Sequence, residues 1–401
     1  MAIAKLTFNK QSGGLGSPLP GQDHYSGFIT YNNSTPSGMT VSNNQAVIYQ
    51  YQDAIALGIN STSFPVEFYH ITEYFRMQPQ GVLYVSFNKV PTGYTFSEVT
   101  ALQSFSNGSI RQVAVYQNSK LFSTSDVSAL NSIASTLEQQ YYQPLSVLYT
   151  ANFGTGSTST YTNVSTLNSG FVSVVIGQDL GGTGYSLFTG LTSTSTTGAT
   201  VSNIGSVLGS VSFAQVSDNI GWVGKFNLDG TNLFYGTLEN DSIGFIDGSL
   251  YRTYSPSALS ALDANGYIFM NKQVGYVGSF NSSDNTCTSS SSSYDSIHNN
   301  RTIDKAIRTL RVAYAPYLNS PLNFNGDGTL TSDTISAFES LGEDALQINM
   351  QSNNEISDLS VTIDPSQNVL STGNLSISMS IIPIGCATTI TVNIGFVTSI
   401  S

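Results

Sequence analysis

Short apolar runs alternate with amphipathic helical patterns between about residue 45 and residue 228. The helical patterns cover residues 125–142, where Ser125 or Asp126 is the expected N-cap, and residues 199–213. This order predicts an α/β region with a mostly parallel sheet and helices on both faces. The apolar runs have the length of buried strands and are AVIYQY (46–51), VLYVSF (82–87), IRQVAVY (110–116), LSVLYTANF (145–153), FVSVVIG (171–177) and IGWVGKF (220–226).

The character of the chain changes after a Ser-rich segment at residues 281–296, which we expect to be a mobile loop. Two amphipathic helices are predicted next, and three alternating strands follow them, so this part is an expected α+β unit. We expect a domain division near residues 230–245. The expected parts are an arm with its linker (1–22), an α/β domain (23–240) and a C-terminal domain (241–401); the helices are 300–318 and 332–350, and the strands are 357–364, 374–382 and 388–397.

Both ends of the chain carry short alternating segments. The last segment, ATTITVNIGFVTSIS, alternates threonine with apolar residues almost to the last position and predicts a strand. An apolar strand at the very end of a chain leaves a sticky edge unless another strand covers it. The first segment precedes a Gly/Pro/Ser linker that cannot hold regular structure. The first segment carries Ile3, Leu6 and Phe8, and one face of the last strand carries Thr388, Ile390, Val392, Ile394 and Phe396.

Charged residues make up only 9% of the chain, against roughly 25% in a typical soluble domain. Uncharged polar surfaces are cheap to desolvate, so this composition suits a protein that packs against other copies of itself. A formal net charge of −12 argues against general binding to nucleic acid. Neither a signal peptide nor a membrane-length apolar span is visible, so folding in the cytoplasm and no membrane insertion are expected.

The sequence offers no convincing catalytic or metal site. His24, His70 and His298 do not lie at ligand spacing from one another, and neither a G-x-S-x-G elbow nor a complete P-loop is present. Residues 323–334 resemble a calcium-binding loop, but Thr334 occupies the position that requires a bidentate glutamate. The two cysteines are a hundred residues apart and form no CxxC motif. We therefore expect no enzymatic activity, no metal and no cofactor.

One cluster of charge stands out. Four basic residues, Arg301, Lys305, Arg308 and Arg311, share one face of the helix at 300–318. They are four of only 13 lysines and arginines in an acidic chain. The face is expected either to meet a partner or to be an ordinary stripe, solvated or paired internally with Asp304 and its neighbours.

Residues from about 244 to 401 resemble the C-terminal half of contractile-tail sheath proteins, and most closely the sheath-like proteins of phages and phage-derived injection systems first classified as a domain of unknown function. The residues that carry the resemblance are the Arg–Asp–Lys helix, NSPL…DGTL (319–330), IDPSQNVLSTG (363–373) and VNIGF (392–396). The first 240 residues are similar only in outline, as an arm followed by an α/β region.

The resemblance implies a subunit that polymerises as stacked rings around an inner tube and contracts to drive that tube through a target envelope. It implies that the N-terminal arm and the C-terminal strand add to the sheets of neighbouring subunits, in a form of β-augmentation. The implied partners are other copies of the chain, the inner tube, the baseplate and the terminator or cap proteins. The basic face would then lie toward the inner tube or an adjacent subunit, in a phage tail or a released or cell-anchored particle.

Two other classes of protein remain open at this point. A secreted surface or glycan-binding protein has a similar Ser/Thr/Asn composition, but an export signal and more regular strand repeats would be expected. A hydrolase on an α/β scaffold is the enzyme alternative, and the many carboxylates could supply acid–base groups.

Overall fold

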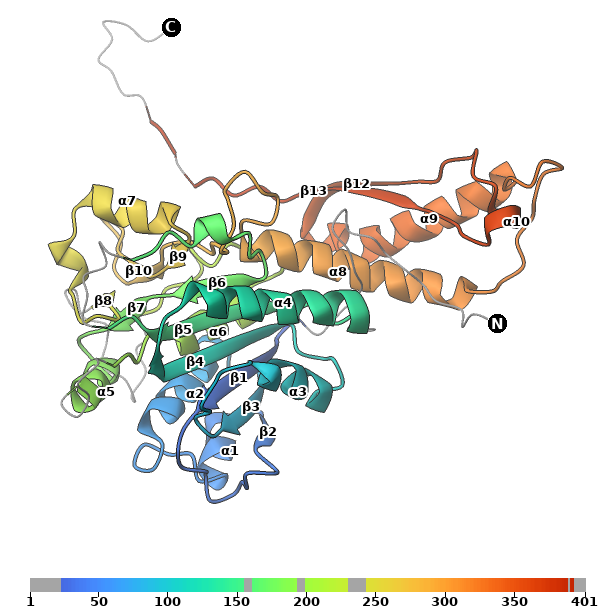
Figure 1. The fold of residues 1–401 in the computed structure, drawn as a ribbon. Helices are drawn as coiled ribbons and strands as arrows, with labels where there is room; N and C mark the ends of the chain where they lie inside the picture. The colour runs from blue at the N-terminus through green and yellow to red at the C-terminus, as the bar shows by residue number, and fades with distance from the viewer. Residues whose placement is uncertain (1–22, 155–160, 193–198, 230–242, 389, 393–401) are drawn as a thin grey trace, which may run out of the picture.

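Seven strands form the central sheet in the order β2-β3-β1-β4-β5-β6-β9 (Figure 1). The computed structural model describes residues 23–154, 161–192, 199–229, 243–388 and 390–392. All neighbouring strands are parallel except β2, which pairs with β3 in the antiparallel direction. The mostly parallel sheet predicted from the sequence is thus confirmed. The strands are β1 Tyr25–Tyr31, β2 Gln45–Ile48, β3 Val82–Asn88, β4 Gln112–Leu121, β5 Ser146–Asn152, β6 Val172–Val175 and β9 Tyr267–Ile268.

Helices cover both faces of this sheet, as the strand–helix alternation predicts (Figure 1). Successive side chains of a strand point to opposite faces, so Phe28 packs in one core and Ile29 in the other. The first core lies under α1 (Tyr51–Ala56), α2 (Pro65–Met77) and α6 (Ile204–Phe213). The second lies under α3 (Ser97–Phe105) and α4 (Thr124–Tyr141).

The remaining short elements of this part lie around the sheet. They are β7 (Gly177–Asp179), which pairs with β8 (Ile243–Phe245), β10 (Met270–Asn271), which pairs with β11 (Phe280–Asn281), and the helices α5 (Thr183–Thr192) and α7 (Pro256–Ala264).

The packing of α2 against α6 depends on glycine. A Cβ atom at Gly205 would lie 2.5 Å from the backbone oxygen of His70, and one at Gly209 would lie 2.7 Å from that of Tyr74. Because glycine has no Cβ atom, the backbones of α6 and α2 can approach each other closely at these two positions. His70 is buried in the core beneath this contact, with an exposed fraction of 1%.

Several expectations for this part were wrong. The central strand β1 was not predicted, and residues 220–226 form turns instead of a strand. The N-cap of α4 is Ser123, whose side chain accepts a hydrogen bond from the Ser125 amide. The Ser-rich segment is anchored to the sheet near its middle, because Cys287 is fully buried and its amide donates to the Val172 oxygen at 2.7 Å.

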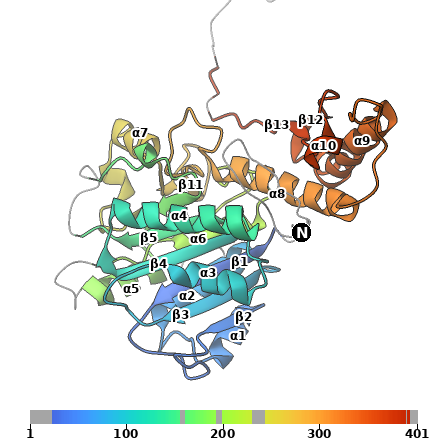
Figure 2. The same cartoon turned by 45° about the vertical axis from the view of Figure 1, so that its right-hand side comes forward.

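The C-terminal elements extend from one side of the α/β part, with α8 (Ile297–Tyr314) running from one to the other (Figures 1 and 2). Helix α9 (Ser332–Asn349) and the antiparallel hairpin β12 (Ile356–Thr362) and β13 (Ser378–Pro383) pack on α8, and α10 (Val369–Thr372) lies in the connection between the strands. Both predicted helices and the first two predicted strands are confirmed. Of the third, Thr388 and residues 390–392 have no strand conformation in the single chain, and residues 389 and 393–397 lie outside the described part.

Candidate assembly site

Helix α8 buries the basic side chains that the sequence places on one of its faces. Arg301, Lys305 and Arg308 have exposed fractions of 4%, 7% and 2%. The Arg301 guanidinium donates to the backbone oxygen of Ala214 at 3.2 Å and to that of Asp23 at 3.3 Å. Burial lowers the pKa of Arg301, although the charge of Asp23 opposes this effect. These three side chains are therefore part of the interior of the chain.

Lys305 lies between two carboxylates from distant parts of the sequence. Its Nζ atom is 3.0 Å from Asp23 Oδ2 and 2.6 Å from Glu355 Oε1. Burial alone would raise the pKa of Asp23, but the charges of Arg308, Lys305 and Arg301 outweigh this effect and lower the pKa. Burial raises the pKa of Glu355, and the contact with Lys305 opposes this shift.

The two carboxylates occupy notable positions in the chain. Asp23 is the first residue that the structure describes, directly after the expected N-terminal arm and linker. Glu355 directly precedes β12, the first strand of the C-terminal hairpin. Lys305 therefore connects the base of the N-terminal arm to the base of the hairpin.

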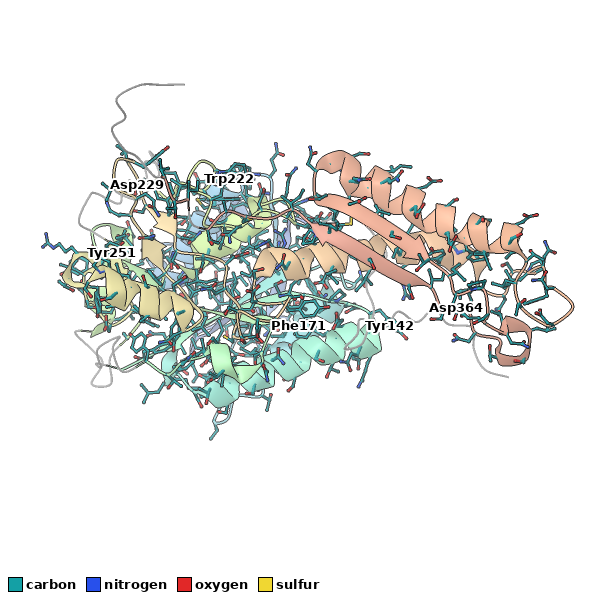
Figure 3. The ribbon with its side chains drawn as sticks, turned by 90° about the horizontal axis from the view of Figure 1, so that it is seen from above. Tyr142, Phe171, Trp222, Asp229, Tyr251 and Asp364 are labelled. Carbon is teal, nitrogen blue, oxygen red and sulfur yellow. The ribbon has the colours of Figure 1, made fainter. Side chains whose placement is uncertain are left out.

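Arg311, the fourth basic residue, is half-buried and lies over the ring of Tyr142, with its Cζ atom 4.8 Å from the ring centroid. Tyr142 is the C-cap residue of α4 and is labelled in Figure 3. This cation–π contact adds a further tie between α8 and the α/β part. Pairing within the chain was one of the two expectations for the basic face. It is found for Arg301, Lys305 and Arg308, whose partners are Asp23 and Glu355. Contact of the four residues with an inner tube or a neighbouring subunit stays a prediction.

The predicted exchange residues fall in two groups. Thr388, Ile390 and Val392 follow the hairpin and are exposed, with fractions of 79% for Ile390 and 70% for Val392. The others, Ile3, Leu6, Phe8, Ile394 and Phe396, lie outside the described residues. Single exposed apolar side chains are common on protein surfaces, but Ile390 and Val392 are two positions apart and so would share one face of an extended strand.

The hairpin has one apolar and one polar face. Ile356 and Val361 of β12 belong to a small core with Leu310 of α8 and Leu346 of α9. The serines of the outer face, at positions 360, 378 and 380, are exposed. The hairpin is thus a two-stranded sheet fixed to two helices, and two strands alone rarely form a stable sheet in water.

Among the described residues, no group of three His, Cys, Asp or Glu side chains is arranged to hold a metal ion. No helix in the described ranges is long and apolar enough to cross a bilayer.

The fold is similar to that of several solved structures. One is the helical sheath of the anti-feeding prophage in the contracted state, with 13% sequence identity, a TM-score of 0.61 and 98% of each chain covered. Another is the sheath complex of PVC, an extracellular contractile injection system, in the contracted state, with 9% identity, a TM-score of 0.57 and coverage of 98% of this chain and 97% of that chain. A third is a sheath tail protein from Desulfitobacterium hafniense, with 9% identity, a TM-score of 0.57 and coverage of 95% and 100%.

The chain therefore has the fold of contractile sheath proteins. It belongs to the DUF2586 family, since residues 3–285 match the N-terminal domain of that family and residues 293–401 match the C-terminal domain. The boundary between these matches lies downstream of the division expected near residues 230–245. No curated protein sequence matches the chain significantly.

Sequence reasoning found the basic residues but missed their acidic partners. Asp23 follows a Gly/Pro linker and Glu355 ends a polar stretch, and neither has a spacing that points to α8. Only the fold brings these side chains together, so no local pattern could have identified them.

Proposed function

We propose that this protein is the structural subunit of a contractile sheath. Copies would polymerise as stacked rings around an inner tube and shorten to drive the tube through a target envelope, without a catalytic step. The fold shared with sheaths of contractile injection systems supports this role. The observation that carries it is the exposure of Ile390 and Val392, which belong to no strand within the described residues, together with a C-terminal sheet of only two strands.

In this proposal the terminal segments complete the hairpins of neighbouring copies. The C-terminal segment from Thr388 to Phe396 and the N-terminal segment with Ile3, Leu6 and Phe8 would each become a strand beside another hairpin. Main-chain hydrogen bonds would supply the affinity, and pockets for alternate side chains would supply the register. The Gly/Pro/Ser linker would let subunits move relative to each other while they remain joined.

Contraction would draw on the difference in free energy between two packings of the same subunits, because packed interfaces are bistable. The proposal assigns the basic residues of α8 a role in this step. Arg301, Lys305 and Arg308 hold Asp23 at the base of the arm, so a change of arm direction would strain or re-pair these contacts. Arg311 is the more exposed of the four and the best placed to meet an inner tube or a neighbouring subunit.

The inner tube, baseplate and terminator proteins are the proposed partners besides further copies of the chain. Assembly in a bacterial cytoplasm, within a phage tail or another contractile particle, is part of the same proposal.

The test is negative-stain microscopy of the full chain and of a variant that lacks residues 388–401. We expect hollow striated tubes from the full chain. The shortened chain should remain folded by circular dichroism but form no tubes. Discrete particles from the full chain would overturn the sheath role, and normal tubes from the shortened chain would overturn strand exchange.

A further inference from the structure

An exposed aromatic surface lies at the rim of the α/β part, where Trp222 is labelled in Figure 3. Trp222 is the single tryptophan of the chain and is 55% exposed, and Phe213 at the end of α6 is 46% exposed. The Lys225 Nζ atom lies 5.6 Å from the centroid of the Trp222 ring and 5.7 Å from that of the Phe213 ring. Asp218 holds this ammonium, with its Oδ2 atom 2.6 Å from Nζ. We call Phe213, Trp222 and Lys225 the aromatic platform, and these contacts order it before any partner binds.

The loop between β10 and β11 adds further apolar side chains beside the platform. Val274, Tyr276 and Val277 of this loop are exposed. The loop is joined to the segment that carries the platform, because Asn227 Nδ2 donates to the Val277 oxygen at 3.4 Å. Exposed apolar side chains are normal when they are scattered, but a cluster of them marks a surface of contact. Tryptophan is also among the residues that contribute most to binding at protein interfaces.

The C-terminal segment leaves its own chain next to the platform. After β13 the chain runs back along the α/β part (Figure 1). Burial raises the pKa of the Cys386 thiol, and a hydrogen bond from the backbone of Asn219 opposes this shift. The Trp222 amide donates to the Asn219 oxygen at 3.0 Å. Cys386 and Trp222 are therefore both neighbours of Asn219.

This exit point limits where a second copy can lie if the strand exchange proposed above takes place. Thr388, the first position of the exchanged segment, is two residues beyond Cys386 and so at most about 7 Å from it. Paired strands lie about 4.8 Å apart. The hairpin that receives the segment would thus lie within about 12 Å of Cys386, beside the platform of the copy that donates it.

The part of the second copy that would meet the platform has matching chemistry. We call residues 312–383 the C-terminal lobe, which contains eight Asp and Glu residues and no Lys, Arg or His. On the outer face of its hairpin, Ile382 is 57% exposed and lies opposite the exposed Asp358 in the strand register. An ammonium group has three donors, so Lys225 can bind a carboxylate of the lobe in addition to Asp218.

We propose that the aromatic platform binds the C-terminal lobe of a second copy of this chain, namely the copy that receives the C-terminal segment. The proposal rests on the strand exchange above and adds a separate contact, made by side chains of the α/β part. The strand would tie the two copies together through the main chain. The platform would fix how the lobe of one copy is oriented against the α/β part of the other.

Photo-crosslinking of full-length chains tests this contact. Copies with the photo-reactive residue p-benzoylphenylalanine in place of Trp222 are mixed, as free subunits, with an excess of heavy-isotope-labelled copies, and cross-linked peptides are identified by mass spectrometry. We expect cross-links to labelled peptides from residues 312–383. The same residue in place of Tyr49, which is 63% exposed next to β2, should give none to these peptides. Cross-links from position 222 only to its own chain, or only to labelled peptides outside the lobe, overturn the proposal.

The fluorescence of Trp222 gives a second measurement without a probe. We expect its emission maximum to move to shorter wavelength when subunits associate, because the indole leaves water. Trp222→Ala should raise the concentration needed for assembly by about tenfold, as loss of a buried tryptophan contact does at other interfaces. The matched control Tyr49→Ala should leave that concentration unchanged. Emission that stays constant through assembly overturns the proposal.

Failure of this contact and failure of the sheath role are distinguishable. Tubes without cross-links from position 222 to the lobe overturn the contact and leave the sheath role in place. Cross-links to the lobe within oligomers that are not tubes support the contact and overturn the sheath role. Chains that stay monomeric at every concentration overturn both.

Discussion

Arg308 Nη2 lies 2.5 Å from Asp23 Oδ1, although 285 residues separate them in the sequence. Lys305 holds the other oxygen of the same carboxylate and also contacts Glu355. Helix α8 is thus the element on which the base of the N-terminal arm and the base of the C-terminal hairpin meet.

Loss of the Lys305 charge should destabilise the subunit. Lys305→Met keeps most of the side-chain volume but leaves Glu355 buried without its cation, so we expect the free energy of unfolding to fall by about 3 kcal/mol. Denaturant titration measures the change. The control Lys89→Met, at an exposed position, should shift it by less than about 0.5 kcal/mol.

Glycine at position 205 should be essential for packing of α6 on α2. Gly205→Ala drives a methyl group into the backbone of His70, and overpacking of this kind costs about 1–3 kcal/mol. Gly190, inside α5, has open space at its Cβ position, so Gly190→Ala should stabilise the protein by about 0.5–1 kcal/mol. Equal effects of the two substitutions on the melting temperature would contradict the close approach of the helices.

His70 should make stability sensitive to acid. Burial lowers the pKa of His70 to about 3, and the Val201 backbone opposes this shift. Between pH 6.5 and pH 3 the unfolded chain binds a proton that the folded chain does not, so stability falls as the pH falls. Replacement by the apolar ring in His70→Phe should flatten the dependence of stability on pH in this window. If the substitution leaves the dependence of stability on pH unchanged, His70 does not contribute to it as predicted.

His298 should act in the opposite direction. Burial alone would lower its pKa, but the hydrogen bond and charge of Asp284 outweigh this effect and raise it. The contribution to stability is then complete below the unfolded value near 6.5 and is lost as the pH rises through the folded value. Urea titrations between pH 6 and pH 9 should show a steeper decline for the unaltered chain than for His298→Gln. Parallel curves would contradict a charged His298–Asp284 pair.

The sequence identified elements whose periodicity is strong and missed those whose pattern depends on the fold. Helices α8 and α9 could be predicted within a few residues because their apolar faces repeat over several turns. Strand β1 was missed because it contains Ser26 and Thr30, polar residues that are fully buried at the centre of the sheet. Ser26 is tolerated there because the Gln112 side chain donates to its hydroxyl at 2.8 Å.

The candidate site shows the same limit. The spacing of the basic residues on α8 is local and was visible, but their burial depends on Asp23 and Glu355, which approach only in the folded chain. Similarly, nothing in the spacing of Glu339 and Glu343 shows that they accept hydrogen bonds from the amides of Ile363 and Val361.

The most direct test of strand exchange is a cryo-EM map of the polymer formed by the full chain, at a resolution that traces the last fifteen residues. We predict that residues 388–397 form a strand hydrogen-bonded to the hairpin of a neighbouring subunit. A map in which these residues pair only within their own subunit would contradict the shared sheet, and with it the proposed basis of assembly.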